Sequence, residues 1–213
     1  MSNNIVAIFA CHTTCMKKYV TTLSNLYNIY SFIDNFIIID SNQEKLSNNL
    51  IEDLKHDPKF YKSFLINNDI YYDFGKWIHV LTNEKLTQFK HILFINDSVL
   101  LTRHVSKYFL YFKDLKQDIN LFAYNDSSQL EVYHYQSYLF IIKQIITNKF
   151  IDFFNSKKEF IKNEKTLIEQ LELNLLKIDP KHDAYLKIAN NFNKYKNIFW
   201  ENEELYEKLV NEQ

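Results

Sequence analysis

Three polar side chains that carry chemistry follow directly on an apolar run. Residues 92–95 are apolar or aromatic, and Asn96, Asp97 and Ser98 come next. This pattern is typical of a strand buried on both faces, and open α/β sheets bind ligands at the carboxyl ends of such strands. Asp97 would therefore present one carboxylate to a ligand. The alternative is a plain turn in which Asp97 caps the segment that follows.

Two cysteines and a histidine form a second candidate site near the amino terminus. Cys11, His12 and Cys15 stand in the pattern C-H-x-x-C, but a closed zinc site needs further ligands, which nothing nearby supplies at the usual spacing. Buried or loop cysteines are the alternative. Two thiols in the whole chain also fit a reducing compartment and are too few for a disulfide framework.

Gly75 is the only glycine among the 213 residues. Glycine permits a positive φ or the close approach of a ligand or of a second backbone. One interpretation is a packing glycine at the start of a helix, beneath Trp77. The other is a loop that lies against a nucleotide, with Asp73 accepting a hydrogen bond from a ribose or sugar hydroxyl.

Arg103 is the only arginine of the chain. It lies at the start of a helix expected over residues 102–115, about one helical turn beyond Asp97. Guanidinium groups suit diphosphates because their fork of donors matches the phosphate oxygens. Arg103 is therefore a candidate diphosphate contact, and a solvated surface arginine is the alternative.

Strand and helix patterns alternate in the first 40 residues. Residues 4–11 have the pattern of a strand, residues 16–30 place apolar side chains at helical spacing, and residues 36–39 form a second apolar strand. Strand, helix and strand in this order predict a right-handed βαβ unit and hence a parallel sheet. Further strands are expected over 62–66 and 118–124 and within 130–146, with a turn at 125–128. The last two strands would form an antiparallel β element.

The carboxyl-terminal part is predicted to be helical from residue 150 onward. Residues 166–176 place leucine and isoleucine at helical spacing, with Glu169 and Glu172 on a shared side. Two carboxylates so spaced are usually a solvated face. Further helices are expected from Asp183. The prediction is a single domain over 1–213, with an α/β core over 1–146 and a helical part over 147–213.

Composition excludes several classes of protein. Apolar residues make up 46% of the chain, and 25 basic residues nearly balance 26 acidic ones, which argues against a nucleic-acid-binding protein with its basic face. No apolar run is long enough to span a bilayer. The first residues lead into a strand pattern without a basic or apolar leader, so no signal peptide and a cytoplasmic location are expected.

Several segments follow one another in an order that is found in a known family. They are Tyr72–Trp77 (YDFGKW), Ile95–Val99 (INDSV), Phe122–Asp126 (FAYND), Tyr133–Tyr138 (YHYQSY) and Leu167–Glu172 (LIEQLE). Their order and spacing resemble the "YDFG-x-W", "NDS", "H-x-Q-S-Y" and "E-x-x-L" elements of the rhamnan-synthesis-F-like glycosyltransferases. Similar single domains occur in glycosyltransferases of large DNA viruses. The likeness covers residues 5–176, which is most of the chain.

The resemblance implies a GT-A fold, a Rossmann-like and mostly parallel sheet flanked by helices. It implies transfer of a sugar, with rhamnose favoured by the family, from a UDP- or dTDP-sugar to a glycan or another hydroxyl acceptor. A viral protein of this kind would act in the host cytoplasm. The resemblance also implies Mn²⁺ or Mg²⁺ as cofactor. One carboxylate, that of Asp97, replaces the usual Asp-x-Asp motif, and with diphosphate oxygens and waters it would suffice for a hard divalent ion.

The resemblance further suggests roles for individual residues. Asp126, at the end of the strand after the metal strand, is the first choice for the base that accepts the proton of the acceptor. His134 is a second catalytic candidate, as a metal ligand with Asp97 or as a diphosphate contact, and a packed histidine is its alternative. Glu169 is a third candidate, on the acceptor side. The expected donor-binding residues are Cys11, His12, Thr13, Asp73, Gly75, Lys76, Asn96, Asp97, Ser98 and Arg103.

Departures from the family pattern keep other functions open. The missing second carboxylate of Asp-x-Asp favours a non-catalytic nucleotide-sugar- or glycan-binding module on the same fold. Leu100 and Leu101 stand where the family commonly has glycine and proline, and Ala123 stands where it commonly has glycine. Because of these changes, the resemblance does not predict the conformation of the backbone at the donor site. An unrelated Rossmann-like enzyme is the third alternative, but no glycine-rich phosphate loop follows the first strand.

Overall fold

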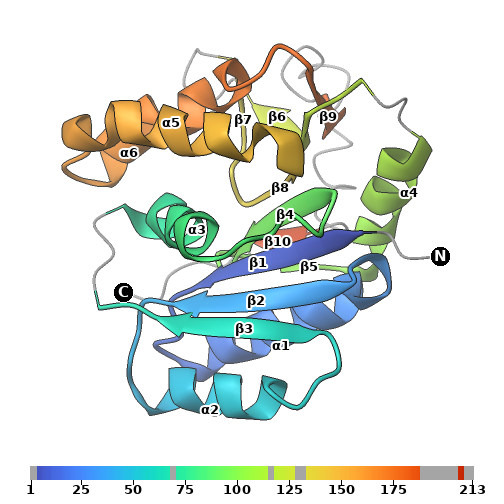
Figure 1. Ribbon diagram of the computed structural model, residues 1–213. Helices are drawn as coiled ribbons and strands as arrows, with labels where there is room; N and C mark the ends of the chain where they lie inside the picture. The colour runs from blue at the N-terminus through green and yellow to red at the C-terminus, as the bar shows by residue number, and fades with distance from the viewer. Residues whose placement is uncertain (1–3, 68–70, 115–117, 128–132, 188–205, 209–213) are drawn as a thin grey trace.

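Four parallel strands form one half of a mixed sheet (Figure 1). The computed structural model describes residues 4–67, 71–114, 118–127, 133–187 and 206–208. The four strands are β1 (Ile5–Cys11), β2 (Asn35–Asp40), β3 (Phe60–Leu65) and β4 (His91–Asn96). They lie in the order β3-β2-β1-β4. β1, β2 and β4 are almost entirely buried, which explains their unbroken apolar runs.

Helices cover both faces of this half of the sheet. α1 (Met16–Ile29) and α2 (Lys45–Leu54) lie on one face, and α3 (Tyr72–Asn83) lies on the other (Figure 1). Right-handed crossovers require this arrangement, because the chain moves outward from β1 to β3 and then returns to the far side of β1. The reversal makes the carboxyl ends of β1 and β4 the switch point of the sheet, where such folds bind ligands.

Antiparallel strands build the second half of the same sheet, as the sequence predicted. β8 (Leu139–Lys143) lies between β4 and β6 (Leu121–Ser127) and is antiparallel to both. β7 (His134–Tyr135) pairs with the end of β6. Residues 125–127 therefore extend β6 and do not form the expected turn. Pairing supplies the reason, because the carbonyl of Asn125 accepts a hydrogen bond from the Gln136 N–H and the next two residues pair with β7.

A short strand that the sequence did not indicate follows β4. β5 (Val99–Leu101) comes directly after the turn at Asp97 and Ser98. The helix expected over 102–115 is correspondingly shorter: a 3-10 turn over 103–105 leads into α4 (Ser106–Asp114). β10 (Tyr206–Lys208), near the carboxyl terminus, pairs antiparallel with β5.

One buried side chain of α1 binds β5 as a neighbouring strand would. The amide nitrogen of Asn25 donates to the carbonyl of Val99 at 2.8 Å, and its amide oxygen accepts from the N–H of Leu101 at 2.7 Å. Asn25 is completely buried, so both bonds are shielded from water. They fix β5, and with it the turn at its start, against α1.

The carboxyl-terminal part is helical up to residue 177 and then adds a strand. α5 (Thr147–Lys157), α6 (Glu164–Gln170) and the 3-10 helix η5 (Glu172–Lys177) cover the same face as α3 (Figure 1). β9 (His182–Leu186) pairs in parallel with β6, where a helix was predicted from Asp183. The free edge of β6 decides this, because strand formation depends strongly on such tertiary context. Residues 188–205 and 209–213, also predicted as helix, lie outside the described residues.

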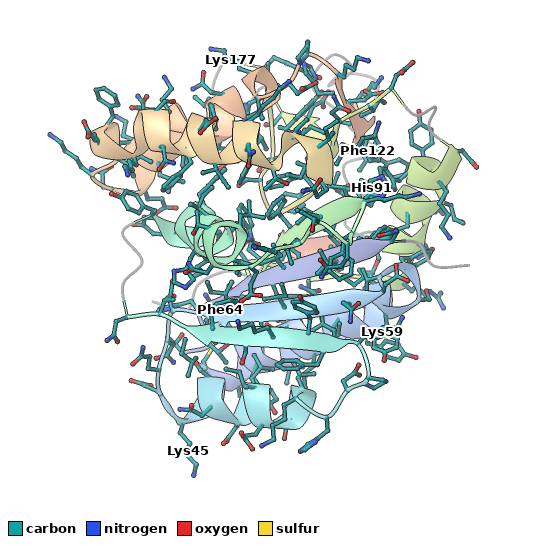
Figure 2. All side chains as sticks on the ribbon, in the orientation of Figure 1. Lys45, Lys59, Phe64, His91, Phe122 and Lys177 are labelled. Atoms are coloured by element: carbon teal, nitrogen blue, oxygen red, sulfur yellow. The ribbon has the colours of Figure 1, made fainter. Side chains whose placement is uncertain are left out.

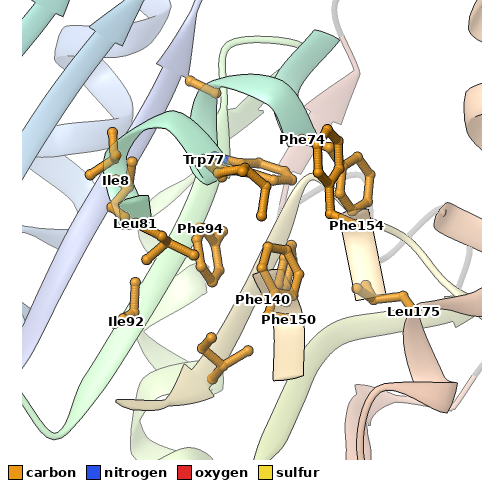
Figure 3. Close-up of a cluster of buried hydrophobic side chains, with 14 of the residues drawn as sticks. Ile8, Phe74, Trp77, Leu81, Ile92, Phe94, Phe140, Phe150, Phe154 and Leu175 are labelled. Atoms are coloured by element: carbon orange, nitrogen blue, oxygen red, sulfur yellow. The ribbon is translucent and has the colours of Figure 1, made fainter. Parts of the chain in front are cut away.

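Aromatic side chains fill the space between the sheet and the layer of α3 and α5 (Figure 3). The ring centroid of Trp77 lies 5.4 Å from those of Phe94 and Phe140. Phe150 of α5 stacks on Phe94 at 5.2 Å. All four side chains are fully buried, and aromatic pairs in such offset and edge-on contacts add to the free energy gained by burial. No helix in the described parts of the chain combines the length and apolarity needed to cross a bilayer.

A second aromatic group packs against the opposite face, beneath α4. The ring of Phe112 lies 5.1 Å from that of His91 and 5.8 Å from that of Phe122. Figure 2 shows His91 and Phe122 at the same end of the sheet, beside α4. The hydroxyl of Tyr108 donates to the carbonyl of Phe122 at 2.8 Å. The sheet is thus covered by an apolar core on each face, and only its edges and strand ends remain for a polar site.

Candidate functional site

Asp97 ties the carboxyl ends of β1 and β4 together at the switch point. Its Oδ2 accepts a hydrogen bond from the backbone N–H of His12 at 2.7 Å, and its own N–H donates to the carbonyl of Ala10 at 3.2 Å. It lies in the turn between β4 and β5 and is 5% exposed. Both interpretations of the sequence therefore describe part of the site, since Asp97 sits in a turn and also at a strand end.

Lys18, which sequence reasoning missed, is the second partner of Asp97. Its Nζ lies 3.4 Å from Oδ1 of Asp97 and its side chain is 20% exposed. Lys18 belongs to the first turn of α1, and this turn follows β1 after a short loop. The signal in the sequence was a basic first turn in the helix that follows a strand, and it does not single out Lys18 from Lys17.

A second group of polar side chains joins α3 to β4 next to Asp97. The amide of Asn96 donates to Oδ2 of Asp73 at 2.7 Å, and the Ser98 hydroxyl donates to the Asn96 amide oxygen at 2.6 Å. The Nζ of Lys76 lies 3.4 Å from Oδ1 of Asp73. The side chain of Lys76 is 2% exposed, whereas that of Asp73 is 27% exposed. The structure thus brings four of the predicted donor-binding residues into one hydrogen-bonded group at the strand ends.

Gly75 lies in the first turn of α3 and not in a loop. Its φ is not positive, so the backbone does not require a glycine there. A Cβ added at Gly75 would lie 2.8 Å from the Cβ of Tyr71, which is closer than real Cβ contacts. Gly75 is therefore a packing glycine of the helix start, and the residue it packs against is Tyr71 and not the expected Trp77.

The end of β2 contributes a buried carboxylate that the sequence indicated only as a strand end. Oδ1 of Asp40 accepts the N–H groups of Thr13 at 3.2 Å and of Asn42 at 2.8 Å. Asp40 and Thr13 are completely buried, and Oδ2 of Asp40 and Oγ1 of Thr13 have no hydrogen-bond partner among the described residues. The bond to Thr13 holds the loop after β1 against the end of β2, and the bond to Asn42 lies within the loop after β2.

Of the three donor-binding candidates around the end of β1, only His12 exposes its side chain. Its Nδ1 lies 2.9 Å from the Ser41 hydroxyl. Cys11 is buried with its thiol 3.6 Å from the Thr22 hydroxyl. Burial and then the negative charge of Asp97 raise the pKa of the Cys11 thiol well above its usual value. Cys11 is thus a buried cysteine, and it does not line a ligand site as placed.

The ends of β6 and β4 are bridged by the residue before β8. The N–H of Asn96 donates to the carbonyl of Tyr138 at 3.3 Å, and the Tyr138 hydroxyl donates to the amide oxygen of Asn125. β4 and β6 run in the same direction on either side of β8, so Asp97, just after β4, and Asp126, near the end of β6, lie at the same edge of the sheet. The spacing of strands puts two such positions about 10 Å apart.

Asp126 is 1% exposed and lies beside Tyr133. Burial and then the negative charge of Asp126 raise the pKa of the Tyr133 hydroxyl, to which Asp126 is hydrogen-bonded. Tyr133 is 40% exposed, so it connects Asp126 to the surface. His134, the next residue, is 2% exposed and has its Nε2 3.4 Å from the amide nitrogen of Gln136. The packed alternative for His134 fits this placement.

Two predicted site residues lie apart from this group. Arg103 is exposed, and β5 separates it from Asp97 along the chain. Glu169 is exposed on α6, and the hydrogen bond to it within the described residues comes from the Asn174 amide to its backbone carbonyl. Within the described residues, neither side chain forms a hydrogen bond or an ion pair with the strand ends.

The residues around Asp97 do not form a site for Mn²⁺ or Mg²⁺ as they are placed. Both oxygens of Asp97 are engaged, one by the His12 N–H and one by Lys18. Among the described residues, no group of three or more histidine, cysteine, aspartate and glutamate side chains is arranged to hold a metal ion. Diphosphate oxygens and waters can complete the ligands of a hard divalent ion on Asp97, but the ion would have to displace the Lys18 ammonium group first.

Comparison with known proteins finds similarity of fold without similarity of sequence. No family model matches the chain, and no curated protein sequence matches it significantly. Among solved structures, a glycosyltransferase involved in the glycosylation of the major capsid of PBCV-1 superposes with a TM-score of 0.54 at 11% identity. That match covers 98% of this chain and 94% of the other.

Two further solved structures share the architecture. The galactosyltransferase LgtC, in complex with donor and acceptor sugar analogs, has a TM-score of 0.51 at 11% identity, over 84% of this chain and 72% of that one. The inositol-1-phosphate CTP transferase from T. maritima has a TM-score of 0.53 at 8% identity, over 88% and 86%. The chain therefore has the mixed α/β fold of GT-A glycosyltransferases, as expected. The third match shows that this fold also carries nucleotidyl transfer.

Proposed function

We propose that this chain transfers a glycosyl group from a nucleoside diphosphate sugar to a hydroxyl acceptor. The observation that carries the proposal is the group of polar side chains at the β1–β4 switch point of a GT-A fold, in which His12, Asp97 and Asp73 come from three different elements. Folds of this type bind ligands at this point. The resemblance of the sequence to glycosyltransferases supports the same reaction.

The donor would lie across the ends of β1 and β4. The exposed imidazole of His12 and the part-exposed carboxylate of Asp73 are the groups that offer a donor and an acceptor to its ribose or sugar hydroxyls. Asn96 and Ser98 hold Asp73 in place through their hydrogen bonds. These contacts would position the anomeric carbon, which is the main contribution a site of this kind makes to the rate.

The acceptor would approach from the side of β6. In the transfer, the bond between the anomeric carbon and the diphosphate oxygen breaks, and its electron pair stays on the diphosphate. The acceptor oxygen forms the new bond and loses its proton to a base. Asp126 is our candidate for this base, because it lies at the same sheet edge as Asp97. Tyr133, which covers it, would have to yield to the acceptor.

The finer identity of the substrates follows from the resemblance alone. The family favours rhamnose as the sugar, carried on UDP or dTDP, and a glycan as the acceptor. The capsid-glycosylating protein of PBCV-1 is a neighbour in fold and agrees with the likeness to enzymes of large DNA viruses. We propose these substrates, with the host cytoplasm as the location of a viral protein, as the first combination to test.

A non-catalytic module that binds nucleotide sugars is the second candidate. One observation favours it: Asp97 and Asp126 are only 5% and 1% exposed, so neither carboxylate is presented openly to a substrate. Such a module would keep the strand-end contacts and would lack the base. Both candidates therefore predict binding of a nucleotide sugar, but only the glycosyltransferase predicts turnover.

Thermal unfolding with UDP-, dTDP- and GDP-sugars, followed by product analysis, tests the proposal. For a glycosyltransferase we expect one nucleotide sugar to raise the midpoint of thermal unfolding. We also expect this nucleotide sugar to be hydrolysed slowly to free sugar and nucleoside diphosphate. Stabilisation without any hydrolysis would indicate the module. Formation of a nucleotide sugar from CTP or UTP and a sugar phosphate, with release of pyrophosphate, would indicate nucleotidyl transfer. No stabilisation by any of these compounds would refute the proposed function.

A further inference from the structure

Two carboxylates at the β1–β4 switch point, those of Asp97 and Asp73, have an ammonium partner. Asp97 faces Lys18 at 3.4 Å, and Asp73 faces Lys76 at the same distance. The two lysines come from the starts of α1 and α3, which lie on opposite faces of the sheet. The positive charge that a nucleotide site needs is thus already present in the side chains of the chain itself.

Lys18 is the ammonium group placed to reach a ligand. Its side chain is 20% exposed, whereas that of Lys76 is 2% exposed. An ammonium has three N–H donors, so Lys18 keeps donors for an anion while one faces Asp97. The His12 N–H holds the other oxygen of Asp97 at 2.7 Å and fixes the carboxylate that positions Lys18. Lys18 is therefore anchored at the mouth of the β1–β4 switch point.

The start of α1 adds a second reason for an anion at this place. A cation in the first turn of a helix is unfavourable, because the amino end of the helix carries partial positive charge. Lys17 and Lys18 both lie in this turn, which contains no acidic residue, and the side chain of Cys15 at the N-cap position makes no capping hydrogen bond. Asp97 offsets part of this charge, and a bound diphosphate would offset more.

We propose that the Lys18 ammonium takes the place of a divalent cation at the donor diphosphate, so that the chain binds its donor without Mn²⁺ or Mg²⁺. This inference rests on the proposed function. It follows from the misfit described above: a metal ion on Asp97 would have to displace Lys18, and two cations so close together repel each other.

In the transfer step Lys18 acts by charge alone. When the bond between the anomeric carbon and the diphosphate breaks, the electron pair moves to the diphosphate oxygen, and the ammonium stabilises this negative charge. Lys18 stays protonated throughout. The proton released in the reaction is that of the acceptor hydroxyl, and it goes to the base.

Calorimetric binding of UDP, dTDP and GDP, in EDTA and in Mn²⁺, tests the inference. For the unaltered protein we expect the dissociation constant of the better nucleotide to differ by less than about threefold between the two conditions. Lys18→Gln should weaken binding in EDTA by about tenfold or more, the usual effect of losing a hydrogen bond to a charged group. Lys18→Arg should recover part of the loss, because it keeps the charge.

Lys17→Gln is the matched control, since it removes the same charge from the same helical turn at an exposed position. It should change binding by less than about threefold, as expected for a solvent-screened charge. Equal weakening by both variants would overturn the role of Lys18 and point to the general field of the helix.

The other outcomes separate this inference from the proposed function. Binding of a nucleotide only in Mn²⁺ would overturn the inference and leave the proposed function standing, whether or not the Lys18 variants fold. Unchanged binding by a folded Lys18→Gln protein would do the same. Absence of binding under both conditions would overturn the inference together with the proposed function.

Discussion

At the scale of single residues, the same carboxylate ties two strand ends together and, in our proposal, lines the donor site. Asp97 accepts the N–H of His12 and so closes the gap between β1 and β4, and it also positions Lys18. A buried acceptor with a charged partner is costly to remove, because the donors it leaves behind lose their hydrogen bonds without regaining water. The stability and the function of the strand ends are therefore coupled through this side chain.

Replacing Asp97 should separate these two contributions. Asp97→Ala removes the contacts to both the His12 N–H and Lys18. We expect the free energy of unfolding to fall by about 1–3 kcal/mol in urea titrations. Asp97→Asn keeps an oxygen for His12 but loses the charge, so it should cost less stability while still slowing donor hydrolysis by about tenfold.

Asp34→Ala is the control for Asp97. Asp34 accepts the N–H of Ile5 at 3.0 Å at the opposite edge of the sheet, so its loss should lower stability and leave donor hydrolysis unchanged. If Asp97→Asn hydrolysed the donor at the normal rate, Asp97 would be purely structural.

Asp126→Asn tests the proposed base. The amide keeps the size of the side chain and cannot take a proton, so donor hydrolysis should fall by about 100-fold or more. Binding of UDP or dTDP should stay within about twofold, because Asp126 lies on the acceptor side in our proposal. Asp183→Asn, on the neighbouring strand β9, should leave both donor hydrolysis and nucleotide binding unchanged. Normal turnover by Asp126→Asn would show that the base lies elsewhere.

The sequence indicated the positions of polar side chains at strand ends and helix starts, and their roles stay predictions. Asp97, Asn96 and Asp73 could be found because they follow an apolar strand or open a helix. Lys18 could not, because a lysine in an amphipathic helix is usually solvated, and only the tertiary position of the turn after β4 makes it a partner of Asp97. Cys11 is buried because all of β1 lies in the core, which fits the alternative of a buried cysteine.

At the scale of elements, the start of α3 shows how composition can mislead. The single glycine of the chain suggested either a packing glycine beneath Trp77 or a nucleotide-contacting loop, and the structure gives it a packing role against Tyr71. Tyr72, with φ of 48°, precedes Asp73 and turns the chain into the helix whose first residues reach β4. The site therefore depends on the entry geometry of α3.

Gly75→Ala tests the packing at this helix start. Alanine favours a helix by about 0.5–1 kcal/mol over glycine, yet its Cβ would meet the Cβ of Tyr71 at 2.8 Å. This contact lies close to the backbone and cannot rotate away, so we expect a net destabilisation of about 1–2 kcal/mol. Urea unfolding measures the sign directly. A stabilised variant would show that the helix start moves freely enough to absorb the methyl group.

The sequence predicted the elements of the parallel half well and those at the sheet edges poorly. β1, α1, β2 and β4 carry strong periodic or apolar patterns, because they are buried on one or both faces. β5 and β9 lack such patterns. Each is short and owes its conformation to partners distant in the chain. The partners of β5 are β10 and Asn25, and the partner of β9 is β6. No local pattern encodes such partners.

At the scale of the whole molecule, one buried carboxylate joins the carboxyl-terminal part to the sheet. Asp179 is 2% exposed, and it binds Lys149 of α5 at 2.6 Å and Asn120, just before β6, at 3.0 Å. Burial alone would raise the pKa of Asp179, but hydrogen bonds from Lys149, the Lys181 N–H and Asn120 together lower it below its ordinary value.

This lowered pKa predicts a pH dependence of stability. The ionised form is favoured in the folded state, so the stabilisation is present above the ordinary pKa of about 3.9 and is lost as pH falls through the lower folded value. Asp179→Asn should therefore reduce the free energy of unfolding by about 1–3 kcal/mol at pH 7. The difference from the unaltered protein should shrink steadily below pH of about 4.

Urea unfolding at several pH values measures this effect. Asp118→Asn is the control, because Asp118 is 88% exposed and faces Lys181 at 3.9 Å, and surface pairs of this kind contribute about 0–1 kcal/mol. A constant difference for Asp179→Asn from pH 7 down to 3 would rule out the ionised carboxylate as its source.

The clamp of Asn25 on β5 restricts which substitutions this region tolerates. Both bonds end on backbone atoms of Val99 and Leu101, so the two apolar side chains are free to be exchanged for others of similar volume. Position 25 itself is not, because among short side chains only that of asparagine carries a donor and an acceptor on two separate atoms. An aspartate there would set a negative charge against the carbonyl of Val99. In libraries that randomise positions 25, 99 and 101, the folded variants should therefore keep asparagine at 25, while the apolar residues at 99 and 101 vary.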